Sequence, residues 1–264
     1  ANSVTDYNAE NAKYALNIDA GDEIHDISDL LFGAFFEDIN FAADGGIYAE
    51  MVQNRSFENF RFDTYDFRSG ENGKSTGRIH DALRFWFGDV DKVTVKNKGG
   101  LREHFGIKDK DVNAYYIEVP AGATLSNRGF CDNKLAYSMN FKADEYYHFS
   151  IWAKPAKTTS VTVALLDAKG NRVSSKVIVK LTKAGEWKKY TAKLEATASC
   201  MGQLSMEFAG DTAIDMVSLM PDNVWGGKKE KKSATAYENY KGNPNYRLRK
   251  DLVEAMLELH PNLR

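Results

Sequence analysis

Residues 30–58 read LLFGAFFEDINFAADGGIYAEMVQNRSFE, and this stretch decides how the rest of the chain is interpreted. In its first part, Leu30–Phe36, apolar side chains occupy both alternating sets of positions. This predicts a strand that is covered on both faces, as in a parallel sheet. Glu37, Asp38 and Asn40 follow at once. Because barrel enzymes place their sites at the carboxyl ends of such strands, these polar residues indicate either a site or a strand that ends in solvent.

The second part of the stretch predicts a change of direction. Asp44-Gly45-Gly46 allows a tight turn with positive φ. Ile47–Val52 then carries apolar residues at near-helical spacing, which predicts a short helix or a turn.

The composition bounds the class of protein. With 264 residues, 43% of them hydrophobic, the chain can bury the core of one or two globular domains. A net charge of −2 argues against nucleic acid or an anionic membrane as partner, and no apolar run approaches the ~20 residues that cross a bilayer. Cys131 and Cys200 lack the spacing of a metal site, so they are either packed thiols or a single disulfide.

The middle of the chain, from residue 82 to residue 220, shows short alternating segments separated by turn signals, which predicts an antiparallel β-sandwich, specifically a jelly roll. Asp167–Asn171 predicts a hairpin turn. No helix is expected in this part. The expected strands are Tyr115–Val119, Tyr147–Ala153, Val161–Leu166, Val173–Val179, Trp187–Leu194, Leu204–Phe208 and Ile214–Leu219.

The two ends of the chain are simpler. Tyr14–Ile18 alternates and predicts a short strand. Lys228–Lys232 contains four lysines, which indicate a solvated loop or a patch for nucleic acid. A single apolar stripe predicts a helix over Tyr246–His260, capped by Asn245 and ended by Pro261.

The segment FGAFFEDINFAADGGIYAEMVQNRSFE, residues 32–58, closely resembles the N-terminal motif of glycoside hydrolase family 51, the α-L-arabinofuranosidases, in the form that carries an inserted carbohydrate-binding-like module. The resemblance extends to RLRKDLVEAMLELHPNLR, residues 247–264, which matches the family's first barrel helix. It implies that Glu37 contacts the furanose at the cleavage subsite.

The resemblance also implies the domain organisation. The expected fold is mainly β, a jelly-roll β-sandwich flanked by the first strand and first helix of a TIM (β/α)8 barrel. Residues 1–20 would form an N-terminal strand that pairs with a C-terminal sandwich outside this chain, and residues 21–53 the first barrel strand and loop. Residues 54–220 would be the inserted sandwich, and residues 221–264 the return loop and first barrel helix.

The inserted part resembles carbohydrate-binding modules of the family 4 and 9 type, through its opening residues 54–58, the strand Gly185–Tyr190 and the closing Ile214–Leu219. Such modules often hold a structural calcium, and Glu58 and Asp215 match its ligands. The residues alone also allow these two carboxylates to face solvent. No other cofactor is expected.

Sugar binding by such a module requires exposed aromatic faces. The large candidates are Trp86, Trp152 and Trp187. The pattern of their neighbours assigns Trp152 and Trp187 to the core and leaves Trp86 open.

For activity, the resemblance implies retaining hydrolysis of terminal α-L-arabinofuranosyl residues of arabinan or arabinoxylan, using two glutamates ~5 Å apart. No residue of this chain corresponds to either glutamate, so we expect no catalytic residue here and a non-catalytic chain. Glu37 and Asp38 are adjacent on a strand and point to opposite faces; Glu37 could converge with Asp44 or Glu50 only through the path of the loop.

Three roles therefore remain open for the chain itself. It is a carbohydrate-binding module without catalysis, a spacer that shapes a cleft or an interface without binding sugar, or a whole enzyme with a rearranged site around Glu37. The expected partner is an arabinose-containing plant polysaccharide or oligosaccharide, met outside the cell by a secreted, periplasmic or surface protein. The unpaired apolar strand Leu30–Phe36 also invites pairing with a second copy of the chain.

Overall fold

The computed structural model describes residues 21, 28, 35–39, 41–62, 78–131, 136–222, 224–225 and 247–258. The chain divides into two compact units, Ala1–Phe35 with His260–Arg264, and Phe36–Leu259. The second unit holds nearly all of the described residues. The predicted strand Tyr14–Ile18, the loop Lys228–Lys232 and the cap Asn245 lie outside them.

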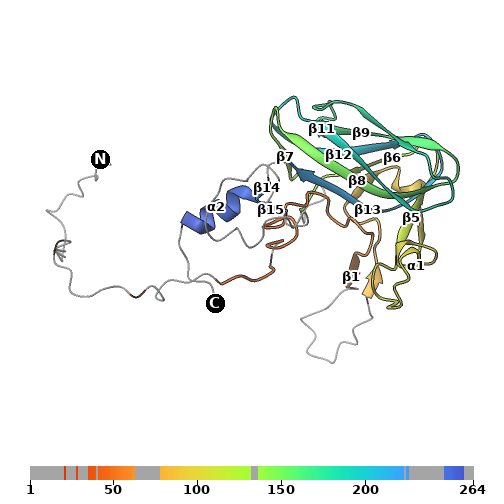
Figure 1. Ribbon diagram of the computed structural model, residues 1–264, viewed down its shortest axis with the longest axis horizontal. Coiled ribbons are helices and arrows are strands. Elements are labelled where there is room, and N and C mark those ends of the chain that lie inside the picture. The colour runs from red at the N-terminus through yellow and green to blue at the C-terminus, as the bar shows by residue number, and fades with distance from the viewer. Residues whose placement is uncertain are drawn as a thin grey trace, which may run out of the picture. The chain divides into compact units, whose positions relative to one another are not determined.

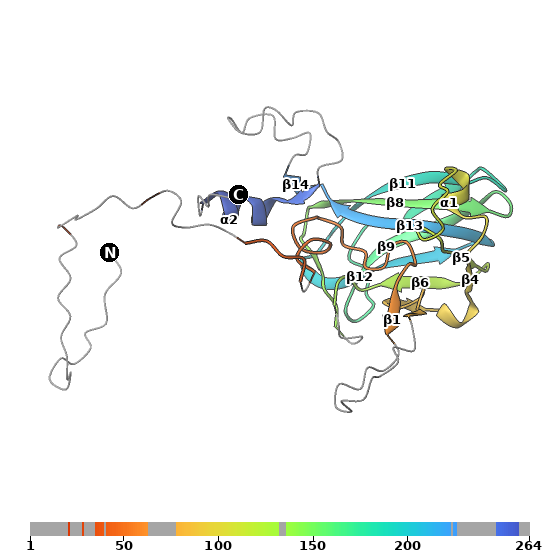
Figure 2. The same cartoon turned by 90° about the horizontal axis from the view of Figure 1, so that it is seen from below.

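Two antiparallel sheets form the body of the second unit, and they lie face to face (Figures 1 and 2). The first sheet has the order β10 (Val177–Leu181), β9 (Thr159–Asp167), β12 (Cys200–Phe208), β6 (Thr124–Asn127) and β3 (Trp86–Gly88), with β7 (Met139–Phe141) also paired to β12. The second has the order β11 (Lys188–Glu195), β8 (Tyr146–Pro155), β13 (Thr212–Pro221), β5 (Tyr116–Val119) and β4 (Thr94–Lys96).

Smaller elements surround the two sheets. They are the hairpin of β1 (Phe60–Phe62) and β2 (Arg78–His80), a 3-10 turn η2 (Val90–Lys92), the short helix α1 (Leu101–His104), the strand pair β14 (Val224–Trp225) and β15 (Leu248–Arg249), and the helix α2 (Lys250–Glu258).

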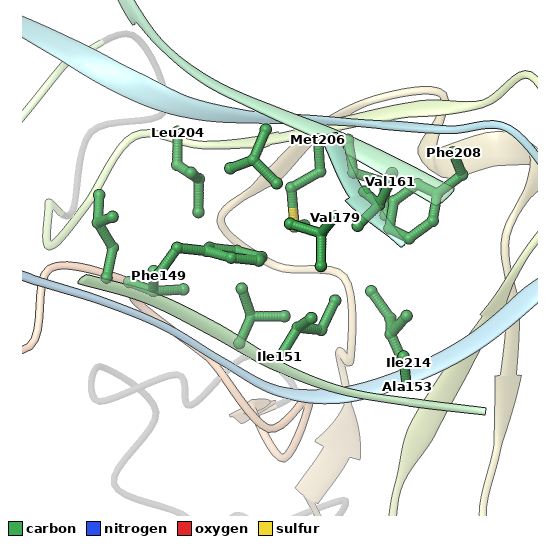
Figure 3. Close-up of a cluster of buried hydrophobic side chains, with 14 of the residues drawn as sticks. Phe149, Ile151, Ala153, Val161, Val179, Leu204, Met206, Phe208 and Ile214 are labelled. Carbon is green, nitrogen blue, oxygen red and sulfur yellow. The ribbon is translucent and has the colours of Figure 1, made fainter. Parts of the chain in front are cut away.

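The core lies between the sheets because their strands alternate apolar and polar residues, and every second side chain of a strand points to the same face. Along β8 each second residue is buried, and Phe149 and Ile151 from this strand oppose Leu204 and Met206 from β12 (Figure 3). Each fully buried side chain of this size contributes about 1.5–3 kcal/mol to the stability of the folded state. This core makes the sandwich the rigid part of the molecule.

The mainly β sandwich is therefore confirmed, and each of the seven expected strands is present in the structure. The strand β10 begins at Val177 rather than Val173. The preceding residues make irregular bonds instead, for example from the Leu165 N–H to the Ser174 hydroxyl at 2.9 Å. The expectation of no helix between residues 82 and 220 is wrong, because α1 is present. A four-residue helix is too short to show a helical period; it forms because Leu101 packs with Tyr116 and Trp187.

The helix α2 is confirmed, with a later start than predicted. It begins at Lys250 because Leu248 and Arg249 pair with Val224 and Trp225 as a short antiparallel ladder. The segment Ile47–Val52 forms turns and an extended stretch and contains no helix.

The turn at Asp44-Gly45-Gly46 is confirmed. Gly45 has a φ of 80°, and a Cβ at this position would lie 2.2 Å from the ring of Phe130. Glycine is required here by both the backbone conformation and the close packing.

Other predictions have mixed outcomes. Residues 30–34 lie outside the described residues; Phe35 and Phe36 are not in a strand and are 88% and 55% exposed, because no described strand pairs with them.

Cys131 and Cys200 are free thiols. Among the described residues there is no helix with the length and apolar character needed to span a membrane.

Strand β13 differs from its neighbours because nearly all of its residues are buried, on both faces. Its inner face joins the core, and the segment after the Gly-Gly turn covers part of its outer face. The Val217 N–H donates to the Arg55 carbonyl at 2.9 Å, and the Met51 N–H donates to the Leu219 carbonyl at 3.0 Å. A bulge between Asp215 and Ser218 interrupts the pairing of β13 with β8. The ionisable groups described next gather on this covered strand.

Candidate functional site

Glu37 lies on an exposed segment without regular structure. The carboxylate of the next residue, Asp38, accepts a hydrogen bond from the Ala43 N–H at 3.0 Å, so Asp38 stabilises the turn. Phe36, on the other side of Glu37, lines an apolar groove of about 530 Å³ together with residues of α2 such as Leu252. Glu37 is therefore accessible to a ligand.

Glu50 is buried and its carboxylate is fully engaged. One oxygen accepts hydrogen bonds from the backbone N–H groups of Val52 and Leu219, at 3.0 and 2.9 Å. The other oxygen accepts from the Ser218 hydroxyl at 2.6 Å and from the Arg55 guanidinium at 3.3 Å. The pKa of Glu50 is raised, because the effect of burial exceeds the opposing effects of Arg55 and of these hydrogen bonds. The Glu50 network thus fastens the segment after the Gly-Gly turn to β13.

Glu58 and Asp215 form a second group of carboxylates, which we call the Glu58–Asp215 pair. Asp215 is completely buried; it accepts hydrogen bonds from the Asn113 amide at 3.0 Å and the Met216 N–H at 2.7 Å. Glu58 accepts one from the Tyr115 N–H at 2.7 Å. Burial raises the pKa of Asp215 to about 8, and the neighbouring Glu58 carboxylate acts in the same direction. Burial also raises the pKa of Glu58.

The surroundings of this pair fit an oxygen-liganded cation. Two carboxylates of like charge lie near each other, Asp215 fully buried and Glu58 half-buried, which is unfavourable without a positive charge between them. The side-chain oxygen of Asn113 is buried and has no hydrogen-bond partner. Carboxylate and amide oxygens are ligands that calcium prefers. The described residues contain no group of three or more His, Cys, Asp or Glu side chains arranged for a metal, so any site here depends on amide or backbone oxygens as well.

None of these carboxylates forms an open catalytic pair in the described structure. Asp44 is exposed, and Glu50 directs both oxygens to its partners at β13, so neither is arranged as a partner for Glu37. Neither Glu58 nor Asp215 lines any of the five cavities of about 450–600 Å³ in this unit. A glycosidic bond could not reach a completely buried carboxylate of this kind.

The three tryptophans lie in different surroundings. Trp86 is 3% exposed and donates through its indole N–H to the Asn54 carbonyl at 3.0 Å. Trp187 is 8% exposed and donates to the Gly99 carbonyl at 3.1 Å, so it is buried as expected, but in a small second cluster with Leu101 and Tyr116 rather than between the sheets. Trp152 is only partly buried and packs against the same cluster, on the outer side of the five-stranded sheet. Its assignment to the core between the sheets is wrong, because its outward-facing neighbours along β8 are Ser150 and Lys154.

Two of these functional residues carried little signal in the sequence. The sequence suggests Glu50 only as a partner for Glu37, and no pattern in it indicates that Glu50 faces β13. Asn113 lies in a polar loop without any motif. Both depend on contacts across more than 100 positions of the chain, 168 to Ser218 and 102 to Asp215.

Similarity to known proteins agrees with this arrangement. The chain is 33% identical over 249 residues to an extracellular exo-α-L-arabinofuranosidase of Streptomyces chartreusis, and the match covers 94% of this chain and 25% of the relative. It is 27% identical over 246 residues to α-L-arabinofuranosidase 1 of Arabidopsis thaliana, which covers 89% of this chain and 30% of the relative. No protein-family model matches the chain.

A solved structure of an arabinose-bound family 51 α-L-arabinofuranosidase has the same fold over 92% of this chain and 35% of its own, with a TM-score of 0.61 and 21% identity. Over most of its length the chain is similar to one part of these α-L-arabinofuranosidases. It spans about a quarter to a third of the length of these relatives. The motif around Glu37 and the sandwich therefore both lie in the region that the chain shares with these relatives.

Proposed function

We propose that this chain is a non-catalytic, substrate-facing part of an α-L-arabinofuranosidase that removes terminal α-L-arabinofuranosyl residues from arabinan or arabinoxylan by a retaining mechanism. In this proposal Glu37 contacts the furanose, and the acid/base and nucleophile glutamates lie outside these residues. The observation that carries it is the state of the carboxylates. Glu50 and Asp215 are buried, Glu58 is half-buried and accepts a bond from the Tyr115 N–H, and among the described residues no second carboxylate is arranged opposite the exposed Glu37.

In retaining glycosidases a single accessible carboxylate is not sufficient for catalysis. Such enzymes need two carboxyl groups ~5 Å apart on either side of the bond that breaks, one as acid and base and one as nucleophile. Glu37 on its own can hydrogen bond to sugar hydroxyls and thereby orient a furanose. It cannot both donate a proton and attack the anomeric carbon.

Two further points of the proposal are supported by the relatives. The Streptomyces relative is named as extracellular, which supports secretion of the present protein. The names of the relatives support an arabinose-containing polysaccharide or oligosaccharide as the partner.

The direct test is release of p-nitrophenol from p-nitrophenyl-α-L-arabinofuranoside by the purified chain, compared with a Glu37→Ala variant. The proposal predicts no release above background for either protein. Release by the unchanged chain that is lost in Glu37→Ala would show a complete site around Glu37 and overturn the proposal.

We also propose that the Glu58–Asp215 pair holds a structural calcium. Glu58, Asp215 and the side-chain oxygen of Asn113 would supply ligands, and the cation would supply positive charge to one buried and one half-buried carboxylate. Its role would be to fix the loop that carries Asn113 against β13. The test is the effect of calcium and of a chelator on stability, described in the Discussion.

A further inference from the structure

The outer face of the five-stranded sheet carries a groove that the residues discussed so far do not use. The groove has a volume of about 480 Å³, within the range of about 300–1,000 Å³ that is usual for small-molecule sites. Three adjacent strands form its floor, since Lys189 on β11 lies opposite Trp152 on β8, and Ser150 on β8 lies between Thr191 on β11 and Ser218 on β13. Figure 2 shows β11, β8 and β13 side by side. Its floor therefore belongs to the rigid sandwich.

One end of the groove offers an aromatic surface. Trp152 is the only one of the three tryptophans discussed above that is not buried, and it lines this groove. The ring of Phe105 packs edge-on against it, with centroids 5.1 Å apart and an interplanar angle of 85°. A tryptophan held in this way presents a fixed apolar surface to which the C–H groups of a sugar ring can pack.

The polar groups of the groove are donors, and its charge is of one sign. Arg55, Lys189 and Arg247 line it, and no aspartate or glutamate does. The Nε of Arg55 is buried without a hydrogen-bond partner, while the same guanidinium contacts Glu50 at 3.3 Å. His148 also lines the groove, and its Nε2 lies 2.6 Å from Asp222. The groove thus has positive charge in excess and hydroxyl groups from Ser150 and Thr191.

We propose that this groove binds an oligosaccharide that carries uronic acid residues, with Trp152 under a sugar ring and the cationic side chains around its carboxylate. Arg55 is already paired with Glu50, but a neutral arabinan or xylan would leave Lys189 and Arg247 without a counter-charge in the groove, whereas guanidinium groups pair with carboxylates through parallel hydrogen bonds. That the ligand is a plant polysaccharide rests on the function proposed above; its acidic character rests on the groove. The sandwich is then a binding module rather than a spacer.

The test is isothermal titration calorimetry of the purified chain with trigalacturonate, and with arabinotriose and citrate as a neutral sugar and a non-sugar anion. The proposal predicts heat of binding with trigalacturonate, and much less with either of the others. Equal binding of citrate would show attraction by charge alone and overturn it, and so would equal binding of arabinotriose or no binding of trigalacturonate.

Two variants connect the binding to the groove. Lys189→Gln changes an exposed side chain on β11, so the fold should not be affected, and we expect about tenfold weaker binding from the loss of one charge-assisted contact. The matched control is Lys180→Gln, an exposed lysine on β10 in the other sheet, which should bind as the unchanged chain does. Equal affinity in the two variants would place the ligand elsewhere. None of these outcomes depends on p-nitrophenol release, so this proposal and the proposed function can fail separately.

Discussion

Glu50 and Asp215 are both buried carboxylates at strand β13, yet their surroundings are opposite. Glu50 has a guanidinium, a hydroxyl and backbone N–H groups as partners. Asp215 has one amide and one backbone N–H, with the Glu58 carboxylate as a neighbour of like charge. Near Asp215, in addition, the Asn113 oxygen has no partner.

The comparison shows two different roles for a buried carboxylate in this chain. The Glu50 network is complete within the chain, so removing any member leaves charges or N–H groups buried without partners. At the Glu58–Asp215 pair, Arg55 and Arg102 lower the pKa values of the carboxyls by less than burial raises them, so the pair is destabilising until a cation binds or a carboxylate is protonated. Neither arrangement resembles an accessible acid and nucleophile, which is why the chain is assigned a non-catalytic role.

The largest effect is expected from Glu50→Ala. This variant removes the partner of Arg55 and of the backbone N–H groups that donate to Glu50, and breaking a buried ion pair on one side costs about 3–5 kcal/mol. The free energy of unfolding, measured with urea, should fall by that amount. Glu207→Ala, an exposed glutamate on β12, is the control and should change it little. A loss below about 1 kcal/mol in Glu50→Ala would contradict the importance of the network.

Calcium is expected to have the next largest effect. If calcium binds only the folded chain, a concentration 100 times the dissociation constant adds about 2.7 kcal/mol to stability, which is several degrees in melting temperature for a protein of this size. Differential scanning calorimetry of chelator-treated protein, with and without added calcium, measures this directly.

The control for the calcium experiment is the same measurement on Asp215→Asn, in which the response should disappear. Magnesium, which demands a smaller and more regular site, should replace calcium poorly. An equal calcium response in Asp215→Asn would place the cation elsewhere and leave the Glu58–Asp215 pair without the proposed role.

The smallest effect concerns His80, whose ring stacks on Tyr115 with centroids 3.4 Å apart. Burial lowers the pKa of His80 below its ordinary value. The unfolded chain therefore binds a proton at this residue first as the pH falls, and stability should decrease as the pH falls below about 6.5. In His80→Gln this part of the pH profile of the melting temperature should flatten, whereas His104→Gln, on the exposed side of α1, should leave it unchanged. A slope that persists in His80→Gln would assign the effect to another group.

Much of the fold could be predicted from the sequence because it rests on local patterns. The alternation along Tyr146–Pro155, the turn at Asp167–Asn171 and the apolar stripe of α2 each appear within a short window. The short strand β3 and the helix α1 could not be predicted in this way, because β3 forms by pairing with β6 and α1 by packing of Leu101 against Tyr116.

The candidate sites, too, could be predicted only where the sequence itself marked their residues. Glu37 and the Glu58–Asp215 pair came from a family resemblance, and the structure adds the burial and the unpartnered Asn113 oxygen that give the pair a physical meaning. The partners of Glu50 and the groove beside Trp152 could not be predicted, because they depend on which face of β8 and β13 the preceding segment covers. A single residue of bulge in β13 changes that face.

The most direct test compares two isosteric neutralisations, Glu50→Gln and Asp215→Asn, by urea unfolding in the presence of a chelator at about pH 9, above the pKa of about 8 of Asp215, so that this carboxylate is charged. In Glu50→Gln the new amide meets the donors of Arg55, so stability should fall. In Asp215→Asn the like charge beside Glu58 is removed and the amide of Asn113 can turn so that its unpartnered oxygen accepts, so stability should rise. Opposite signs are the result that this account predicts, and a loss of stability in both variants would contradict it.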